Sequence, residues 1–290
     1  MEKCLSAKKA AELMLISARI RRSALEMVYR ATSGHIGGSF SICELLTALY
    51  FKEMRINTEA PRDPDRDRFV LSKGHCTPAL YSVLAERGFF PTQLLSTFRD
   101  IDSDLSGHAE MKRVKGVDMS TGSLGQGFSA AVGMALAGKL DKKDYRVYAI
   151  LGDGEIQEGQ IWEASMAAGN YGLNNLCAIV DNNNIQIDGR ISEIMSPYPI
   201  DEKFKAFGFN VLTCDGHNME SICQAFDQAR ECKGKPSVII AKTIKGKGVS
   251  FMEDTNEWHG NDPNTEQYLA AAKELDEAIA LAEKEVKLYE

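Results

Sequence analysis

Two short apolar runs in this 290-residue chain end in oxygen-bearing side chains. The first, YAILGDGEIQEGQ at 148–160, places Asp153 between two glycines, and the second, LCAIVDNNNIQIDG at 176–189, passes into an acid and three amides. An apolar run that meets glycine and then a helical pattern is typical of a buried strand entering a tight turn. Carboxylate and amide oxygens are ligands that suit Mg²⁺ or Ca²⁺. The two stretches therefore predict a shared site for a divalent metal and a phosphate group.

The spacing of the two runs allows both to reach one pocket. Asp153 and Asn183 are 30 residues apart, and a helix is expected between them over roughly Gln157 to Tyr171. A strand, one crossover helix and a second parallel strand need about this length. Ligands of such sheets bind beyond the carboxyl ends of the strands. Gly152 and Gly154 would let the backbone approach a ligand, and the helix would offer its N-terminus to a phosphate.

The order of strand, glycine-containing loop and helix recurs along the chain. It appears at FVLSKGHCTPALYSVL, at YRVYAILGDG and at LCAIVDNNN, while a helical pattern precedes the glycine-rich SGHIGGS at 33–39. Strands alternating with helices predict an α/β fold with a doubly wound, mostly parallel sheet flanked by helices. We expect residues 1–265 to form the ligand-binding domain. Residues 266–290 read as a charged amphipathic helix of the same domain or of an interface.

Composition restricts the classes of partner. The net charge of −7 argues against a nucleic-acid-binding surface, which would need a basic stripe. No apolar run approaches the ~20 residues of a membrane span, so no membrane association is expected and a cytosolic protein is predicted. Seven scattered cysteines without a CxxC pair are interpreted as reduced thiols.

Five motifs in the same order resemble transketolase. GDGEIQEG followed by DNNNIQIDG is similar to the thiamine diphosphate motif, and SGHIGG, SKGH, TGSLGQG and KTIKGKG…WHG accompany it between about Ala31 and Gly260. The resemblance covers the family's first, diphosphate-binding domain. It implies the thiamine-diphosphate-binding fold and an N-terminal subunit of a split transketolase, which transfers a two-carbon ketol unit from a ketose or its phosphate to an aldose or its phosphate. Pentose-phosphate carbohydrate metabolism is the family default.

The resemblance also implies site residues. A metal, Mg²⁺ with Ca²⁺ or Mn²⁺ as alternatives, would be held by Asp153, Asn183 and the carbonyl of Ile185. Thiamine diphosphate would be contacted by His75, Gly122, Ser123, Leu124, Gly154, Glu155, Asn183 and His259. Glu158 matches a glutamate that reaches the other active site across the dimer, although a glutamate early in a helix is often only a partner of the helix dipole.

Histidines are the expected proton carriers. Four of the five lie beside glycine in motif loops, whereas His217 lies outside the motifs and is expected to have no role in the site. Imidazoles that are neutral near pH 7 both donate and accept hydrogen bonds, which suits sugar hydroxyls. We expect His35, His108 and His259 to face the sugar. The flanking residues in LSGHAE differ from the prolines usual in the family, which weakens the transfer to His108.

The resemblance implies a partner. The glutamate that activates the aminopyrimidine belongs to the family's pyrimidine-binding domain, so a C-terminal subunit is expected to supply it, in a two-plus-two hetero-oligomer. This chain alone is then expected to be inactive. Two alternatives stay open: a subunit of a 2-oxo acid dehydrogenase or deoxyxylulose-phosphate synthase, and a non-catalytic cofactor-binding regulatory subunit.

Overall fold

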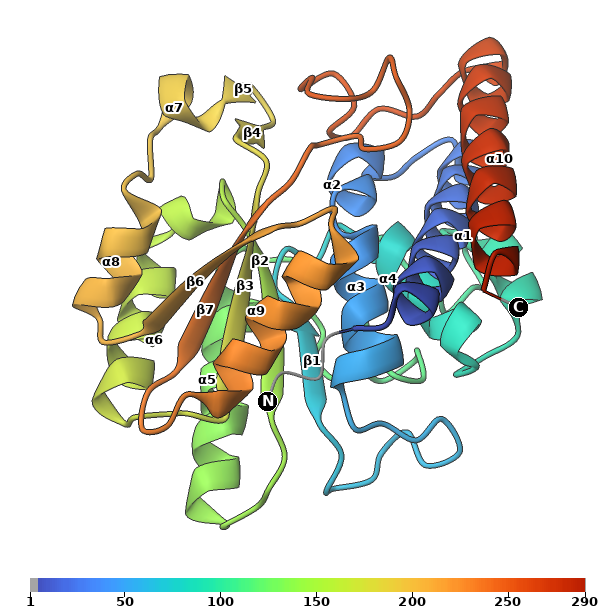
Figure 1. The fold of residues 1–290 in the computed structure, drawn as a ribbon. Helices are drawn as coiled ribbons and strands as arrows, with labels where there is room; N and C mark the ends of the chain where they lie inside the picture. Colours follow the sequence, from blue (N-terminus) through green and yellow to red (C-terminus); the bar gives the residue numbers. More distant parts are fainter. Residues whose placement is uncertain (1–4, 290) are drawn as a thin grey trace.

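A parallel sheet of five strands forms the centre of the structure, a computed structural model that describes residues 5–289 (Figure 1). The spatial order is β1-β2-β3-β7-β6, and each neighbouring pair is parallel. The strands are β1 (Arg68–Leu71), β2 (Val147–Gly152), β3 (Leu176–Asn182), β6 (Asn210–Asp215) and β7 (Ser237–Lys242). The predicted α/β class with a mostly parallel sheet is confirmed.

Helices cover both faces of this sheet. One face packs against α1 (Ala7–Ala31), α3 (Cys43–Ala48), α4 (Thr77–Arg87) and α9 (Met219–Glu231). The other face packs against α5 (Gln126–Leu140), α6 (Gly159–Asn170) and α8 (Ile200–Ala206). Because parallel strands joined by crossover helices are covered on both sides, their sequences are continuously apolar rather than alternating.

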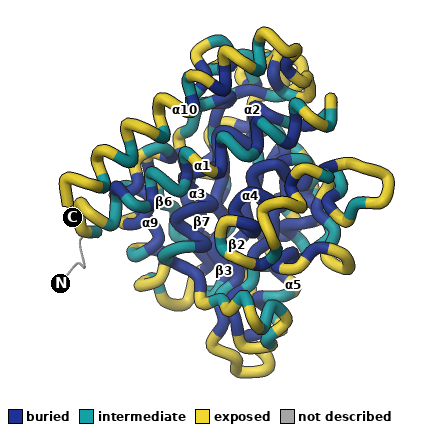
Figure 2. Tube along the Cα trace, turned by 90° about the vertical axis from the view of Figure 1, so that its right-hand side faces the viewer, coloured by how far each residue is buried: buried dark blue, intermediate teal, exposed yellow. Residues whose placement is uncertain are grey.

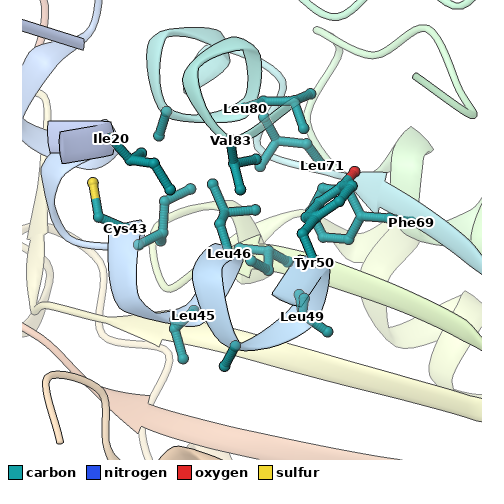
Figure 3. Close-up of a cluster of buried hydrophobic side chains, with 14 of the residues drawn as sticks. Ile20, Cys43, Leu45, Leu46, Leu49, Tyr50, Phe69, Leu71, Leu80 and Val83 are labelled. Carbon is teal, nitrogen blue, oxygen red and sulfur yellow. The ribbon is translucent and has the colours of Figure 1, made fainter. Parts of the chain in front are cut away.

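Successive strand residues point into different cores. In β2, Tyr148 and Ile150 belong to the core under α3 and α4, whereas Ala149 and Leu151 belong to the core under α5 and α6. Figure 2 shows the resulting interior of buried residues. Figure 3 shows part of the first core, in which side chains of α1, α3, α4 and β1 meet, among them Ile20, Leu46, Phe69, Leu71, Leu80 and Val83.

The C-terminal helix α10 (Thr265–Lys287) packs along α1. A third apolar cluster, to which α1 contributes Leu25 and Val28 and α10 contributes Leu275, joins the two helices, and α10 starts with an Asn264–Gln267 capping box. The outer side of α10 is exposed (Figure 2). We propose on this basis that α10, which makes up most of the segment predicted at 266–290, belongs to the same domain as the sheet and its helices.

Several local elements differ from the sequence-based expectation. Within SGHIGGS, Ile36–Phe40 forms a short helix, α2, and α3 passes into a π-helical turn at Leu49–Glu53. The crossover helix α6 begins at Gly159, after a 3₁₀ turn at Glu155–Gln157. A further 3₁₀ helix spans Thr92–Thr97.

The segment between β3 and α8 contains structure that was not predicted. Its elements are β4 (Ile185–Gln186), β5 (Gly189–Arg190) and α7 (Ile191–Ile194), with β4 and β5 forming an antiparallel hairpin. Among residues 5–289, no helix combines the length and the apolar character needed to cross a membrane.

One contact between α6 and the turn before β6 predicts a stability effect. A Cβ placed on Gly169 would lie 1.8 Å from the carbonyl oxygen of Phe207. Because that atom is backbone, the helix itself would have to move, and Gly169→Ala should lower the free energy of unfolding by about 1–3 kcal/mol in urea titrations.

Gly133→Ala in α5 is the matched control. No atom lies within 4 Å of a Cβ added there, so alanine should stabilise the helix by roughly 0.5–1 kcal/mol. Similar free energies of unfolding for the two variants would contradict the close approach of α6 to Phe207.

Candidate active site

A cavity of about 410 Å³ opens beyond the carboxyl ends of β1, β2 and β3. It is framed by α2, the β4–β5 hairpin and the segment after β7, which lie along the upper side of the molecule in Figure 1. Every predicted site residue except Ser123 lines it: His35, His75, His108, Gly122, Leu124, Asp153, Gly154, Glu155, Glu158, Asn183, Ile185 and His259. A larger cavity of about 570 Å³, near residues 89–105, contains none of them.

Glycines allow the loops of this cavity to approach one another closely. A Cβ on Gly37 in α2 would lie 2.8 Å from the carbonyl oxygen of Trp258, and a Cβ on Gly74 would lie 2.7 Å from the backbone nitrogen of Gly122. The loop that carries His35 therefore packs directly on the loop that carries His259. In the same way, the loop of His75 packs directly on the loop of Leu124. The glycines of the sequence motifs are therefore needed for loop packing.

The three predicted metal ligands lie on adjacent segments of the cavity wall. Asp153 Oδ1 accepts a hydrogen bond from Gly154 N at 2.9 Å, Asn183 Oδ1 accepts one from Ile185 N at 3.1 Å, and Ile185 O accepts one from Lys245 Nζ at 3.1 Å. Burial, with the nearby carboxylate of Asp181, raises the pKa of Asp153 to about 6. A buried carboxylate of this kind is stabilised by a cation.

The donor set fits a hard cation. Among residues 5–289 no Lys, Arg or His forms an ion pair with Asp153, so its charge has no direct compensation there. A carboxylate, an amide oxygen and a carbonyl oxygen are typical Mg²⁺ or Ca²⁺ ligands. Within the described chain, no group of three or more His, Cys, Asp or Glu is arranged around a possible metal position. The predicted metal ligands include only one residue of these four types, Asp153, because the other two ligands are an amide oxygen and a backbone carbonyl.

A buried carboxylate that was not predicted orients Asn183. Asp181 is fully buried and accepts hydrogen bonds from Ser41 Oγ at 2.6 Å, Lys73 Nζ at 2.6 Å, Asn183 Nδ2 at 2.9 Å and Thr243 Oγ1. Burial alone would raise the pKa of Asp181, but Lys73 holds it below its usual value. Because Asp181 holds the amide nitrogen of Asn183, the orientation of the amide is fixed, and its oxygen is the atom that accepts from Ile185 N and that a cation would use.

Four histidines from separate loops meet at the cavity. The ring centroid of His35 lies 4.9 Å from that of His75, 5.5 Å from that of His259 and 6.2 Å from that of His108. Burial, followed by nearby positive charges, lowers the pKa of His35 to about 4 and that of His259 to about 3, and it also lowers the pKa values of His75 and His108. The four imidazoles are therefore neutral near pH 7.

Lys245 joins this group although the sequence reasoning did not single it out. Its Nζ lies 2.7 Å from His259 Nδ1, and burial together with Lys73 lowers its pKa to about 8. A lysine aimed into a cavity of neutral histidines provides a positive charge for an anionic ligand. Its place in the KTIKGKG motif was the signal that could have identified it.

The sequence matches the family described as "Transketolase, thiamine diphosphate binding domain" over residues 13–276. The chain belongs to the transketolase family. It is 50% identical over 257 residues to a 6-deoxy-6-sulfo-D-fructose transketolase subunit of Clostridium sp. (strain MSTE9), covering 89% of this chain and 94% of that protein. It is 45% identical over 273 residues to an apulose-4-phosphate transketolase subunit of Phocaeicola vulgatus, covering 94% and 97% of the two chains.

Solved transketolases share the fold. The transketolase of Campylobacter jejuni superimposes with a TM-score of 0.86 at 32% identity, covering 96% of this chain and 46% of that one. The transketolase of Leishmania mexicana gives 0.82 at 29% identity. This transketolase domain therefore spans a little under half the length of the solved chains that it matches.

Glu155 is directed into the scaffold of the transketolase domain. Its carboxylate is 3% exposed and accepts hydrogen bonds from Ser72 Oγ, from Gly125 N at 2.9 Å and from Gly152 N at 3.0 Å. It thereby ties the loop at 122–125 to the ends of β1 and β2. The predicted contact with the cofactor would be made through these loops.

Glu158 has the opposite character. It is the exposed N-cap residue of α6, and its side chain makes no capping hydrogen bond. A carboxylate at this N-cap lies at the positive end of the helix dipole, so the alternative interpretation as a partner of that dipole stays open. An exposed carboxylate at the cavity rim suits a residue that reaches another protomer.

His217 lies outside the cavity and forms part of a hydrogen-bond network around the buried ion pair of Arg21 and Glu44. Its Nδ1 lies 3.1 Å from Glu44 Oε2, and its Nε2 accepts a hydrogen bond from Ile244 N at 2.8 Å. Glu44 also accepts hydrogen bonds from Arg21 at 2.7 and 2.8 Å. This network supports the backbone immediately before Lys245.

The network predicts a pH-dependent stability. Burial would raise the pKa of Glu44, but Arg21 and His217 lower it to about 2. Since the unfolded-state pKa is roughly 4.3, the ionised carboxylate stabilises the fold above that pH, and this contribution is lost as the pH falls toward 2. Glu44→Gln should cost about 3–5 kcal/mol at pH 7 in urea unfolding, because it leaves Arg21 buried without its partner.

The difference between wild type and Glu44→Gln should shrink steadily below about pH 4. Glu12→Gln is the control: its ion pair with Lys9 has side chains 35% and 43% exposed, and its loss should cost about 1 kcal/mol or less. A pH-independent cost at Glu44 would contradict the role of its charge.

Proposed function

We propose that this chain is the N-terminal, diphosphate-binding subunit of a two-subunit, thiamine-diphosphate-dependent transketolase. It would take part in moving a two-carbon ketol unit from a ketose or ketose phosphate to an aldose or aldose phosphate. The observation that carries the proposal is the single cavity in which an oxygen-donor set for a cation faces four neutral histidines and a lysine. The two relatives named as transketolase subunits, matched over more than nine-tenths of their own length, support it.

The cation and the diphosphate would be held from three sides. Asp153, Asn183 and the Ile185 carbonyl would hold Mg²⁺, while backbone groups of residues 122–124 and 154 would bind the phosphates, with His75 and His259 beside them. Lys245 adds a positive charge on the side of the segment after β7. When bound, thiamine diphosphate supplies the carbon that receives the ketol unit.

The histidines would act on the sugar. His35, His108 and His259 present neutral imidazoles, which can accept a proton from a hydroxyl or donate a hydrogen bond to a carbonyl. Their separate loops surround the space from different sides, so they would fix the orientation of the sugar as well as move protons. Glu158, exposed at the rim, would contact a second active site in the assembly.

A second subunit would complete the site. We propose a C-terminal partner that carries the pyrimidine-binding domain and the activating glutamate, in a two-plus-two assembly in the cytoplasm. The relatives are named for a sulfofructose and for apulose 4-phosphate, so the substrate is proposed as a sugar or sugar phosphate rather than as a pentose phosphate specifically. No relative or solved neighbour described above is named as a 2-oxo acid dehydrogenase or as a deoxyxylulose-phosphate synthase.

Asp153 provides the first test. It is the only charged member of the proposed ligand set, so Asp153→Asn should weaken thiamine diphosphate binding to the assembled complex by roughly 2–4 kcal/mol, about 30- to 1000-fold. Calorimetric titration in excess Mg²⁺ measures this change. Asp102→Asn, an exposed acid away from the cavity, should leave the affinity unchanged. Equal affinities for Asp153→Asn and wild type would remove the metal assignment.

Reconstitution provides the second test. The chain alone, with thiamine diphosphate and Mg²⁺, should transfer no ketol unit, and addition of the C-terminal subunit should produce activity with ketose phosphates but not with pyruvate. The physical reason is that the reacting groups must be held together in one geometry, which half a site does not provide. Substantial transfer by the chain alone would contradict the split-enzyme proposal. Cofactor binding without transfer in the complex would favour the non-catalytic alternative.

A further inference from the structure

Two copies of the tripeptide Ser-Gly-His, at 33–35 and 106–108, each deliver one histidine to the cavity. A single side chain connects them. Arg99 Nη1 donates a hydrogen bond to Ser33 Oγ at 2.9 Å. Its guanidinium also lies on Gly107, where a Cβ would stand only 2.4–2.7 Å from three of its atoms. A side chain at 107 would therefore displace the guanidinium from this position.

The backbone of Arg99 is fixed in a conformation that non-glycine residues rarely adopt. Its φ is 65°, in the left-handed region, and its N–H donates to the Leu105 carbonyl at 2.9 Å. The loop that follows is also anchored to α4, because Thr77 Oγ1 donates to Gly107 O and Tyr81 OH donates to His108 O. Such conformations persist where surrounding contacts fix them, and they are enriched at functional sites.

The charge of Arg99 is not neutralised by an ion pair. No carboxylate lies within ion-pair distance of its guanidinium among residues 5–289. Arg99 is exposed, so solvent partly screens this charge, but the loops that it joins carry the two imidazoles. Burial is the larger cause that lowers the pKa of both His35 and His108, and Arg99 is the next.

The other titratable groups that act on these two imidazoles are neutral or positive, although the same cavity is also lined by the carboxylates of Asp153, Glu155 and Glu158. His35 faces the rings of His75, His108 and His259 and the ammonium of Lys245, and His108 faces His35. None of them is a carboxylate that would favour a protonated ring. Within the part of the chain that the structure describes, Arg99 is the charged group that acts on both His35 and His108.

We propose that Arg99 is a positioning residue, which joins the two Ser-Gly-His loops and adds its charge to the effect of burial in keeping the two histidines that face the sugar unprotonated. Its catalytic consequence rests on the function proposed above. An unprotonated imidazole can accept a proton from a sugar hydroxyl, and a protonated one cannot. The hydrogen bond to Ser33 would set the separation of the two rings, and the charge would add to the effect of burial on their protonation.

The effect of Arg99 on the pKa values of His35 and His108 can be tested without cofactor or partner. The full chain is labelled with [¹³C]histidine, the ring resonances are assigned with His35→Gln and His108→Gln, and their shifts are followed against pH by NMR. Arg99→Met should move the titrations of both rings to higher pH. Arg99→Lys, which keeps the charge, should move them less. Arg113→Met, which removes an exposed cation in the neighbouring segment, should leave them unchanged.

The effect of Arg99 on catalysis is tested with the assembled enzyme. Since activity is lost when the imidazoles become protonated, raising their pKa should shift the acid limb of the kcat/KM profile of Arg99→Met to higher pH. Ser33→Ala keeps the charge but loses the hydrogen bond, so it should lower kcat without moving that limb. Arg113→Met should reproduce the wild-type profile.

The outcomes of these experiments distinguish the proposed role of Arg99 from the proposed transketolase function. Histidine titrations in Arg99→Met that superimpose on those of wild type would overturn the role of Arg99, whether or not the complex is active. A wild-type complex without ketol transfer would overturn the proposed function while the NMR titrations still decide on Arg99. If Arg99→Met does not fold, Arg99→Gln removes the same charge with a polar side chain, and unchanged titrations in Arg99→Gln together with an unchanged kcat in Ser33→Ala would overturn the inference.

Discussion

The candidate site depends on one buried ion pair, between Lys73 and Asp181. Their side chains are 3% and 0% exposed, and Lys73 Nζ lies 2.6 Å from the carboxylate and 2.9 Å from the carbonyl oxygen of Gly38. Taking two charges out of water is costly, and the cost is offset only when further hydrogen bonds complete the geometry. Ser41, Asn183 and Thr243 donate those bonds to Asp181. The pair thus joins segments that are far apart in the chain around the amide of Asn183.

The same pair sets the electrostatic balance of the cavity. Asp181 contributes to the raised pKa of Asp153, and Lys73 contributes to the lowered pKa of Lys245. Each charge of the buried pair therefore destabilises the like charge that faces the open cavity. The result is a carboxylate that favours a cation and an ammonium that favours an anion, side by side. A metal ion bound together with a diphosphate would satisfy both charges.

The sequence predicted what local patterns encode. Apolar runs ending in GDG and DNNN indicated the strands, their parallel arrangement and the convergence of Asp153 with Asn183, because strand and crossover lengths restrict the topology. It did not predict that Asp181 pairs with Lys73, since the two lie 108 positions apart and their contact depends on how the loops pack. The β4–β5 hairpin was missed because two-residue strands carry no periodic signal. Glu155 shows the same limit: its position in the motif was clear, but the direction of its side chain was not.

The cluster of four histidines is held in its neutral state by a cooperative arrangement. Centroid separations of about 5–6 Å mean that protonating one ring would disfavour protonation of the others, in a site where burial already opposes charge. A bound anion would act in the opposite direction, because negative charge near His75 and His259 favours their protonated forms. Lys245 beside His259, Lys73 beside His75 and Arg99 beside His35 and His108 oppose that effect. The cations around the cavity would therefore allow one space to bind an anionic ligand and still present neutral imidazoles to a sugar.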